Sequence, residues 1–221
     1  MEVEFSVPKV PYRETIKKVA EGQGKYKKQT GGHGQYGDVW LRLEPASEYG
    51  FEWRITGGVI PSKYQEAIEE GIKEAAKKGV LAGFPVMGFK AIVYNGSYHE
   101  VDSSDLAFQI AASLAFKKVM AEAHPVLLEP IYRLKVLAPQ ERVGDVLSDL
   151  QARRGRILGM EQEGALSVVH AEVPLAEVLE YYKALPGLTG GAGAYTLEFS
   201  HYAEVPPHLA QRIVQERAQE G

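Results

Sequence analysis

Cysteine is absent from this sequence of 221 residues, which excludes disulfide bonds, thiolate metal sites and thiol catalysis. The chain also has no run of about 18 apolar residues and no charged N-terminal segment followed by an apolar one, so we predict neither a membrane span nor a signal peptide. A formal net charge of only −4 argues against a polycation that coats nucleic acid with its whole surface. Any nucleic-acid contact must come from a local patch, and we expect a cytoplasmic monomer.

The length favours two compact domains, and a hydrophobic fraction of 45% is enough to build their cores. The segment HPVLLEP at 124–130 has two prolines and interrupts the hydrophobic rhythm, so we place a boundary there, with domains at 1–126 and 127–221. The opening segment MEVEFSVPKVPY at 1–12 begins inside a strand-like alternation. We therefore expect the chain to be a piece of a longer protein.

The hydrophobic periodicity predicts a mixed α+β fold. In the first domain, strands are expected at 36–43 and 51–55 as antiparallel partners, and another at 88–94. One helix is expected to start at Pro61, and another to start at an N-cap at Ser103 or Ser104 and to end before Pro125.

The second domain has a regular order of elements. We expect a strand at 131–138, a helix at 141–153, strands at 156–162 and 166–173, a helix from Pro174 and a strand at 195–201. This βαββαβ order is the split-βαβ or ferredoxin-like arrangement. A short helix is expected after Pro206-Pro207.

The segment TGGHGQYG at 30–37 contains G-x-G-x-x-G, the pattern of dinucleotide-binding loops. In such a site a buried strand precedes the loop and a helix follows it, because the pyrophosphate sits on the helix N-terminus. Here the polar segment GKYKKQ precedes the loop and an alternating strand pattern follows it. The context therefore argues against a nucleotide site.

The same loop stands beside a concentration of positive charge. Between Arg13 and His33 the sequence has six basic residues and two acidic ones. Exposed backbone amides next to lysines suit a phosphodiester backbone. An ordinary solvated hairpin loop explains the residues equally well, and the sequence physics leaves both interpretations open. The residues concerned are Lys25, Lys27, Lys28, Gly31, Gly32, His33, Gly34, Gln35 and Gly37.

A second polar loop at 95–104 includes Ser97, His99, Glu100 and Asp102. A Ser/His/Asp triad is disfavoured, because triad residues converge from separate parts of a fold. A metal site is weakly supported, since no complementary ligand cluster occurs elsewhere. A functional role for this loop depends on whether it lies beside the glycine loop.

Arg153, Arg154 and Arg156 follow the first helix of the second domain. Cations complement a helix C-terminus, and Gly155 is a natural capping residue there. Three arginines exceed what capping requires, so an anion-binding role stays open beside the structural one. The segment TGGAGAY at 189–195 is an uncharged, flexible turn by composition.

Taken together, several segments resemble the C-terminal half of bacterial elongation factor G. The resemblance covers nearly the whole chain in order and with the same spacing. The segments are YRETI (12–16), QTGGHGQYGDV (29–39), GGVIPSKY (57–64), GFPV (83–86), GSYHEVDSSDLAF (96–108), LEPI (128–131), GDVLSDLQARRGRILGM (144–160), VPLAE (173–177) and HYAEVP (201–206).

The resemblance implies that the first domain is the elongated fourth domain of that factor, with a fold like ribosomal protein S5, and that the second is its fifth domain. In the family, the fourth domain enters the decoding region of the small ribosomal subunit during translocation. The glycine loop and the second loop, with Ser97, Tyr98, His99 and Glu100, would then contact messenger and transfer RNA. The fifth domain lies near the sarcin–ricin loop and stalk base of the large subunit, which gives the three arginines a use.

Two positions depart from the family pattern: His33 stands where a basic residue is common, and the segment TGGAGAY lacks the arginine usual in that turn. The chain also lacks G-x-x-x-x-G-K-[ST], the phosphate-binding loop of the family's GTPase domain. We therefore expect no enzyme activity and no cofactor in this chain, with GTP and Mg²⁺ used by a longer parent. The alternatives are a paralogue that serves ribosome recycling or ribosome protection and, with little support, an enzyme built on His99.

Overall fold

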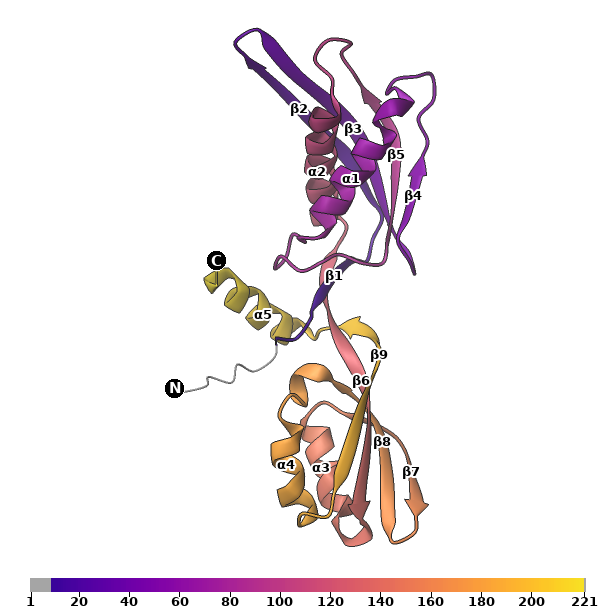
Figure 1. The fold of residues 1–221 in the computed structure, drawn as a ribbon, viewed down its shortest axis with the longest axis vertical. Helices are drawn as coiled ribbons and strands as arrows, with labels where there is room; N and C mark the ends of the chain where they lie inside the picture. The colour runs from indigo at the N-terminus through magenta and orange to yellow at the C-terminus, as the bar shows by residue number, and fades with distance from the viewer. Residues whose placement is uncertain (1–8, 221) are drawn as a thin grey trace, which may run out of the picture. The chain divides into compact units, whose positions relative to one another are not determined.

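The computed structural model describes residues 9–220 (Figure 1). Its contacts divide the chain into two compact units. The first unit contains Arg13–Leu127 and the C-terminal segment from Val205 onward. The second unit contains Leu128–Glu204 and the described residues before Arg13. The strand-like alternation noted at 1–8 lies outside the described residues.

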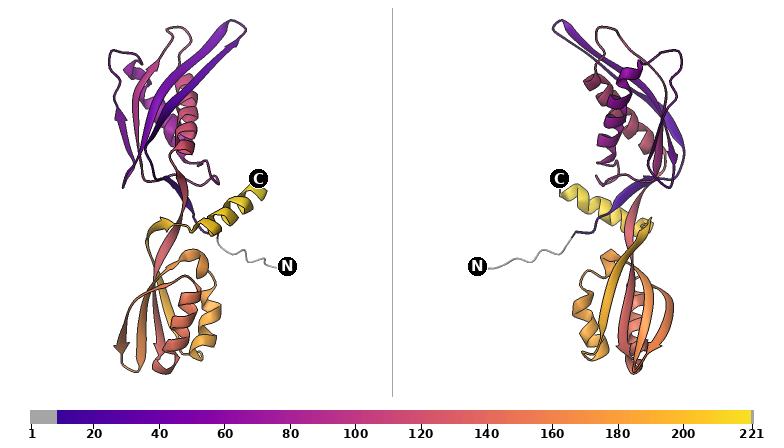
Figure 2. Two further views of the ribbon diagram at one scale, coloured as in Figure 1. Left: turned by 180° about the vertical axis from the view of Figure 1, so that it is seen from behind. Right: turned by 45° about the vertical axis from the view of Figure 1, so that its right-hand side comes forward.

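The first unit is built on a four-stranded sheet in the order β2-β3-β5-β4. Helices α1 and α2 cover one face of this sheet, and no helix of the described residues covers the opposite face (Figure 2). The elements are β1 (Arg13–Ile16), β2 (Ala20–Thr30), β3 (His33–Pro45), β4 (Gly50–Trp53), α1 (Gln65–Ala76), β5 (Phe89–Ser97), α2 (Asp105–Glu122) and α5 (Pro207–Gln219). A 3-10 turn at Ser62–Tyr64 precedes α1.

Helix α2 lies unusually close to the sheet, because glycines of β2 and β3 face it. A Cβ atom added to Gly37 would stand 2.6 Å from the carbonyl oxygen of Ala107, and one added to Gly24 would collide with the backbone at Ala111 and Ala115. The predicted N-cap is confirmed: the Ser104 side chain accepts a hydrogen bond of 3.1 Å from the amide of Ala107. Backbone of the helix therefore rests directly on backbone of the two strands.

The second unit has the predicted βαββαβ order. Its elements are β6 (Pro125–Pro139), α3 (Val143–Ala152), β7 (Arg156–Glu163), β8 (Leu166–Pro174), α4 (Tyr181–Thr189) and β9 (Ala194–Glu204). Strand β6 begins in the first unit, enters the second at Leu128, and also pairs with β1. Strand β6 pairs with both β8 and β9, and β7 pairs with β8, all antiparallel. This pairing gives the spatial order β9-β6-β8-β7 and confirms the ferredoxin-like arrangement and the α+β class.

Several predicted elements differ from the observed ones. The polar segment before the glycine loop is strand β2, which the sequence analysis did not predict. The strand predicted at 51–55 does not pair with β3, because β4 runs parallel to β5 and both β2 and β5 occupy the edges of β3. The segment after Pro174 forms only a 3-10 turn at Leu175–Glu177, and α4 starts at Tyr181.

The chain between the two units also differs from expectation. Residues 125–130 continue into β6 without a break, although two prolines lie among them. Helix α5, expected from the sequence to belong to the second domain, groups by its contacts with the first unit. The boundary between 126 and 127 stays a prediction about independent domains.

Candidate nucleic-acid interface

The glycine segment is the turn of a β-hairpin. Gly31 and Gly32 have φ of 53° and 101°, in the left-handed region that favours glycine. The residues from His33 onward belong to β3 and pair with β2. A strand therefore flanks the turn on both sides, and no helix begins there to hold a pyrophosphate, which removes the structural basis of a dinucleotide site.

The second polar loop lies directly against this hairpin. The amide of Tyr36 donates a hydrogen bond of 2.9 Å to the carbonyl of Asp102, and Ser103 Oγ donates one of 2.9 Å to the carbonyl of Tyr36. Within the loop, the amide of His99 donates to Ser103 Oγ at 2.9 Å. The two segments proposed from sequence thus form one structure, which we call the tip: residues 25–38 together with 97–104.

A buried polar network fixes the base of the tip. Ser97 Oγ lies 2.6 Å from the hydroxyl of Tyr36 and donates to Asp38 Oδ2 at 2.7 Å. The side-chain amide of Gln23 donates to Asp38 Oδ1 at 2.6 Å. Asp38 is only 6% exposed, so these bonds replace the water that its carboxylate would otherwise bind. Ser97 is therefore engaged with Asp38 and Tyr36, an arrangement unlike a nucleophile that a histidine activates.

Removing the Ser97 hydroxyl tests this network. Ser97→Ala takes one hydrogen bond from a buried carboxylate and one from the Tyr36 hydroxyl, so we expect a decrease of about 1–3 kcal/mol in the free energy of unfolding. Chemical denaturation measures this decrease. Tyr36→Phe, which removes only the outer hydroxyl, should cost less, and equal costs for the two variants would contradict the central place of Asp38.

The surface of the tip is positively charged. Lys25, Lys27 and Lys28 are exposed, and no carboxylate of the described residues lies within ion-pair distance of them. Lys25 Nζ stands 5.5 Å from the centre of the Tyr36 ring, and the His99 ring lies 4.2 Å from the same ring, centre to centre. Exposed cations thus stand beside aromatic rings at the tip, an arrangement common in nucleic-acid interfaces, although the Tyr36 ring itself is only 8% exposed.

The remaining predicted tip residues differ in exposure. Exposed ones are Gly31, Gly32, His33, Tyr98, His99 and Glu100. Gly34 and Gln35 are partly buried, and Gln35 Oε1 has no hydrogen-bond partner among the described residues. Gly37, expected on an exposed loop, is instead buried against α2. Tyr36, Asp38 and Gln23 were not predicted as site residues. For Tyr36 and Asp38 the available signal was their alternation with Val39 and Leu41 along β3, whereas Gln23 lies on β2, opposite Trp40.

Two of the three arginines that were predicted as a group, Arg153 and Arg154, have partners inside the fold. Arg153 donates to Asp149 at 2.8 Å and to the carbonyl of Glu177 at 2.7 Å. Arg154 makes two hydrogen bonds, of 2.7 and 3.0 Å, with the carboxylate of Glu129, which is 3% exposed. These bonds raise the pKa of the Arg154 guanidinium. Both residues therefore hold parts of the fold together through these hydrogen bonds. Their contact with RNA stays a prediction.

Arg156 is different, because its side chain is 73% exposed while it pairs with Glu172 at 2.9 Å. The helix ending also differs from the prediction. Arg154, with φ of 58°, is the left-handed residue after α3. Gly155 is needed for another reason: a Cβ atom there would stand 2.7 Å from the carbonyl oxygen of Leu150.

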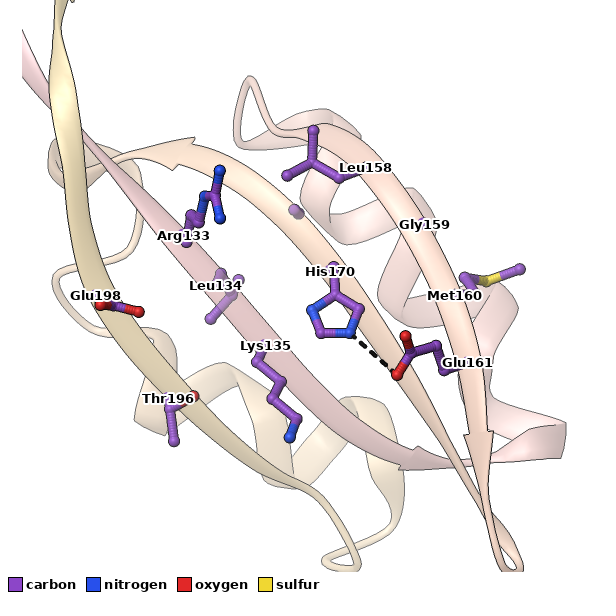
Figure 3. Close-up of a pocket in the computed structure, with 11 residues that line it drawn as sticks. Arg133, Leu134, Lys135, Leu158, Gly159, Met160, Glu161, His170, Thr196 and Glu198 are labelled. Atoms are coloured by element: carbon purple, nitrogen blue, oxygen red, sulfur yellow. Dashed lines mark ion pairs between the residues drawn. The ribbon is translucent and has the colours of Figure 1, made fainter.

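A hollow of about 570 Å³ lies on the sheet of the second unit. Figure 3 shows Arg133 and Lys135 on one strand, His170 on the next and Glu161 beyond it. His170 Nε2 lies 3.6 Å from Glu161 Oε2, a separation that suits an ion pair when the imidazole is protonated. Charges of both signs line the hollow, so it has no strong preference for an anion or a cation.

Residues 9–220 contain neither a metal-binding cluster nor a helix suited to span a membrane. No cluster of three or more histidine and carboxylate side chains is placed to hold a metal ion in this part of the chain. Across the same residues, none of the helices combines the length and the apolar character needed to cross a membrane.

Comparison with known families accounts for both units. A family model described as Elongation factor G, domain IV matches residues 8–124, and one described as Elongation factor G C-terminus matches residues 126–213. The tip falls within the first match, and the ferredoxin-like unit falls within the second.

Individual relatives agree. The chain is 51% identical over 220 residues to an elongation factor G of Aquifex pyrophilus, covering 98% of this chain and 32% of the relative. It is 51% identical over 224 residues to an elongation factor G-like protein of Thermotoga maritima, covering 100% and 33%, and 51% identical over 217 residues to an elongation factor G of the same organism, covering 96% and 31%. The chain spans about a third of the length of these relatives. With both units matched in order, the chain belongs to the elongation factor G family.

Proposed function

We propose that this chain is the ribosome-engaging C-terminal part of a translation factor, and that its tip enters the decoding region of the small subunit to contact messenger and transfer RNA during translocation. The observation that supports this most directly is the joining of the two predicted loops into one tip, with three lysines that pair with no carboxylate of the described residues. Such a tip works by shape and by contact with the phosphate backbone. It needs no bond-making chemistry of its own.

The GTPase step belongs to another part of such a factor. The sequence has no phosphate-binding loop, and the described residues have no cluster of carboxylates that would hold Mg²⁺. The residues present therefore do not fit GTP with Mg²⁺, and in our proposal a parent protein supplies both. The role of this chain is to position its tip once that parent has docked.

Co-sedimentation with ribosomes tests the proposal. We expect binding of the chain to fall with salt, because lysine–phosphate contacts release counterions. Lys25, Lys27 and Lys28 changed together to alanine should weaken binding and flatten the dependence of log affinity on log salt by about 2–3, roughly one for each phosphate that the variant no longer neutralises.

A matched control removes the same charge elsewhere. Lys78, Lys117 and Lys118 are also exposed lysines of the first unit, carried near or on its helices. Their triple alanine variant should bind like the unchanged chain. Equal weakening by the two triple variants would show an effect of net charge alone, and binding that ignores salt would contradict the proposed contact with phosphates.

For the second unit we propose contact with the sarcin–ricin loop and stalk base of the large subunit. Arg156 is the member of the arginine group that is available for it, since most of its side chain is exposed. Arg156→Ala should reduce binding of the chain to isolated large ribosomal subunits. If the Arg156→Ala variant binds large subunits as well as the unchanged chain does, the proposal that Arg156 contacts them is wrong.

Ribosome recycling is the second candidate function, because the elongation factor G-like relative is as similar as the relatives named elongation factor G. The chain itself can be used as a competitor to separate the two. If it serves translocation, an excess should slow translocation by a complete factor and leave subunit splitting unchanged. The reverse pattern would favour recycling.

A further inference from the structure

The sheet of the first unit has a second face, opposite the one that α1 and α2 cover (Figure 2). In antiparallel pairs, residues opposite each other point to the same face. Val39, Leu41 and Leu43 point to the helices and into the core. The alternate residues of β3 and their partners on β2 therefore point the other way, which places Lys27 with Tyr36, Lys25 with Asp38 and Gln23 with Trp40.

Aromatic rings lie along this face. The rings of Trp40 and Tyr94 are 6.5 Å apart between centres, and both side chains are partly exposed. Toward the tip, the Tyr36 ring follows; this residue is only 8% exposed, and the ammonium group of Lys25 stands 5.5 Å from the centre of its ring. From Lys27 to Gln23, the partner of Trp40, the strand covers about 13 Å. Over this length the face carries two exposed lysines, Lys25 and Lys27, and the partly exposed rings of Trp40 and Tyr94.

The charge of the face changes along its length. At the end away from the tip, Arg42 pairs with Glu44 at 2.8 Å, and Glu52 pairs with Arg54 at 2.7 Å and with Lys90 at 2.9 Å. Hydrogen bonds from Arg54 and Lys90 lower the pKa of Glu52 to about 2, so these pairs persist at neutral pH. Near the tip, Asp38 is occupied by Ser97 and Gln23. Among the described residues of this face, the lysines beside the aromatic rings are therefore the cations left for an outside anion.

We propose that this face binds a single-stranded RNA segment, with bases stacked on Trp40 and Tyr94 and phosphates against Lys25 and Lys27. Stacking platforms beside available cations are the general means of holding unpaired nucleic acid. A protein partner fits less well, because the centre of a protein interface is depleted of charge, whereas here lysines stand among the rings. This inference rests on the proposed function, because the RNA-binding face lies next to the tip that is proposed to contact messenger and transfer RNA.

The two tryptophans of the sequence provide a direct test. Trp53, on β4, packs against the core on the helix side, so Trp53→Phe leaves Trp40 as the only tryptophan. We expect titration of this variant with an eight-nucleotide single-stranded RNA to quench its fluorescence to saturation. The reciprocal variant Trp40→Phe, which keeps Trp53, should show no such quenching. An inorganic polyphosphate should bind without quenching, because it has no bases to stack.

Affinity measurements complete the test. Trp40→Ala should weaken RNA binding about tenfold, the range of one stacked base, and Lys25→Ala with Lys27→Ala should reduce its salt dependence. Circular dichroism checks that the variants are folded. If RNA binds without quenching Trp40 while the lysine changes still weaken ribosome binding, the stacking proposal fails and the tip proposal stands. If Trp40→Ala weakens ribosome binding but the chain does not bind RNA, the face contacts protein and the stacking proposal is overturned.

Discussion

Glu14→Ala is expected to lower the free energy of unfolding of the first unit by about 3–5 kcal/mol. The Glu14 carboxylate is fully buried and accepts three backbone hydrogen bonds, from Leu81 at 2.8 Å, Ala82 at 3.0 Å and Phe84 at 2.9 Å. Each buried amide left without an acceptor costs about 1–3 kcal/mol. Urea denaturation of the variant and the unchanged chain measures the difference.

The same substitution should loosen helix α5. Arg217 of this helix donates to the carbonyl of Ala82 at 3.0 Å and lies 4.5 Å from the centre of the Phe84 ring, so it binds the segment that Glu14 holds. Faster hydrogen exchange in α5 would report the release. Glu48→Ala removes the same charge at an exposed position and should change stability by less than about 0.5 kcal/mol. A decrease below about 1 kcal/mol for Glu14→Ala would contradict the role of its carboxylate.

Arg154→Ala is expected to cost about 3–5 kcal/mol in the second unit, because it leaves the buried carboxylate of Glu129 without a counter-charge. Thermal or urea unfolding checks this value. Adding Glu129→Gln to the variant should recover part of the stability, since a neutral amide is less costly to bury than an unpaired carboxylate.

Arg156→Ala is the matched control for that prediction. In its ion pair with Glu172 the arginine side chain is 73% exposed, whereas that of Glu172 is 15% exposed; solvent screening of the arginine limits the expected contribution to about 0–1 kcal/mol. The three neighbouring arginines would then separate by experiment into buried structural partners and a surface cation. Equal costs for Arg154→Ala and Arg156→Ala would contradict the assignment made from their exposure.

Local periodicity predicted the parts of the fold that depend on local sequence. Helices α1 and α2 and the whole βαββαβ order follow from the spacing of apolar residues. Strand β2 was not predicted, because its sequence, AEGQGKYKKQT, is polar and contains two glycines. Glycine is a poor strand former. The segment is a strand because it pairs with β3 along its whole length, and Gly24 leaves room for the backbone of α2; both are long-range contacts that propensity does not record.

The other differences between the predicted and the observed fold concern the prolines of β6 and the pairing of β4. Pro125 is the first residue of β6, a position where its missing amide does little harm, and Pro130 precedes a bulge between Ile131 and Tyr132. The parallel pairing of β4 with β5 joins segments far apart in sequence, and alternation within one strand carries no information about its partner. The same limit applies to the tip. Each of its two loops could be predicted from its own sequence, but the hydrogen bonds of Asp38 that join them could not, because they link residues far apart in the chain.

The contact between α2 and the hairpin has a mechanical consequence. Most helices rest on a sheet through a layer of side chains that can slide and change rotamer, but at Gly24 and Gly37 the backbones meet without one. We therefore expect a force on the turn at Gly31-Gly32 to pass through β2 and β3 into the 18-residue helix α2 with little bending. Replacing Gly24 or Gly37 by a larger residue would force α2 away from the strands and weaken this transmission, while every charge at the tip would stay in place.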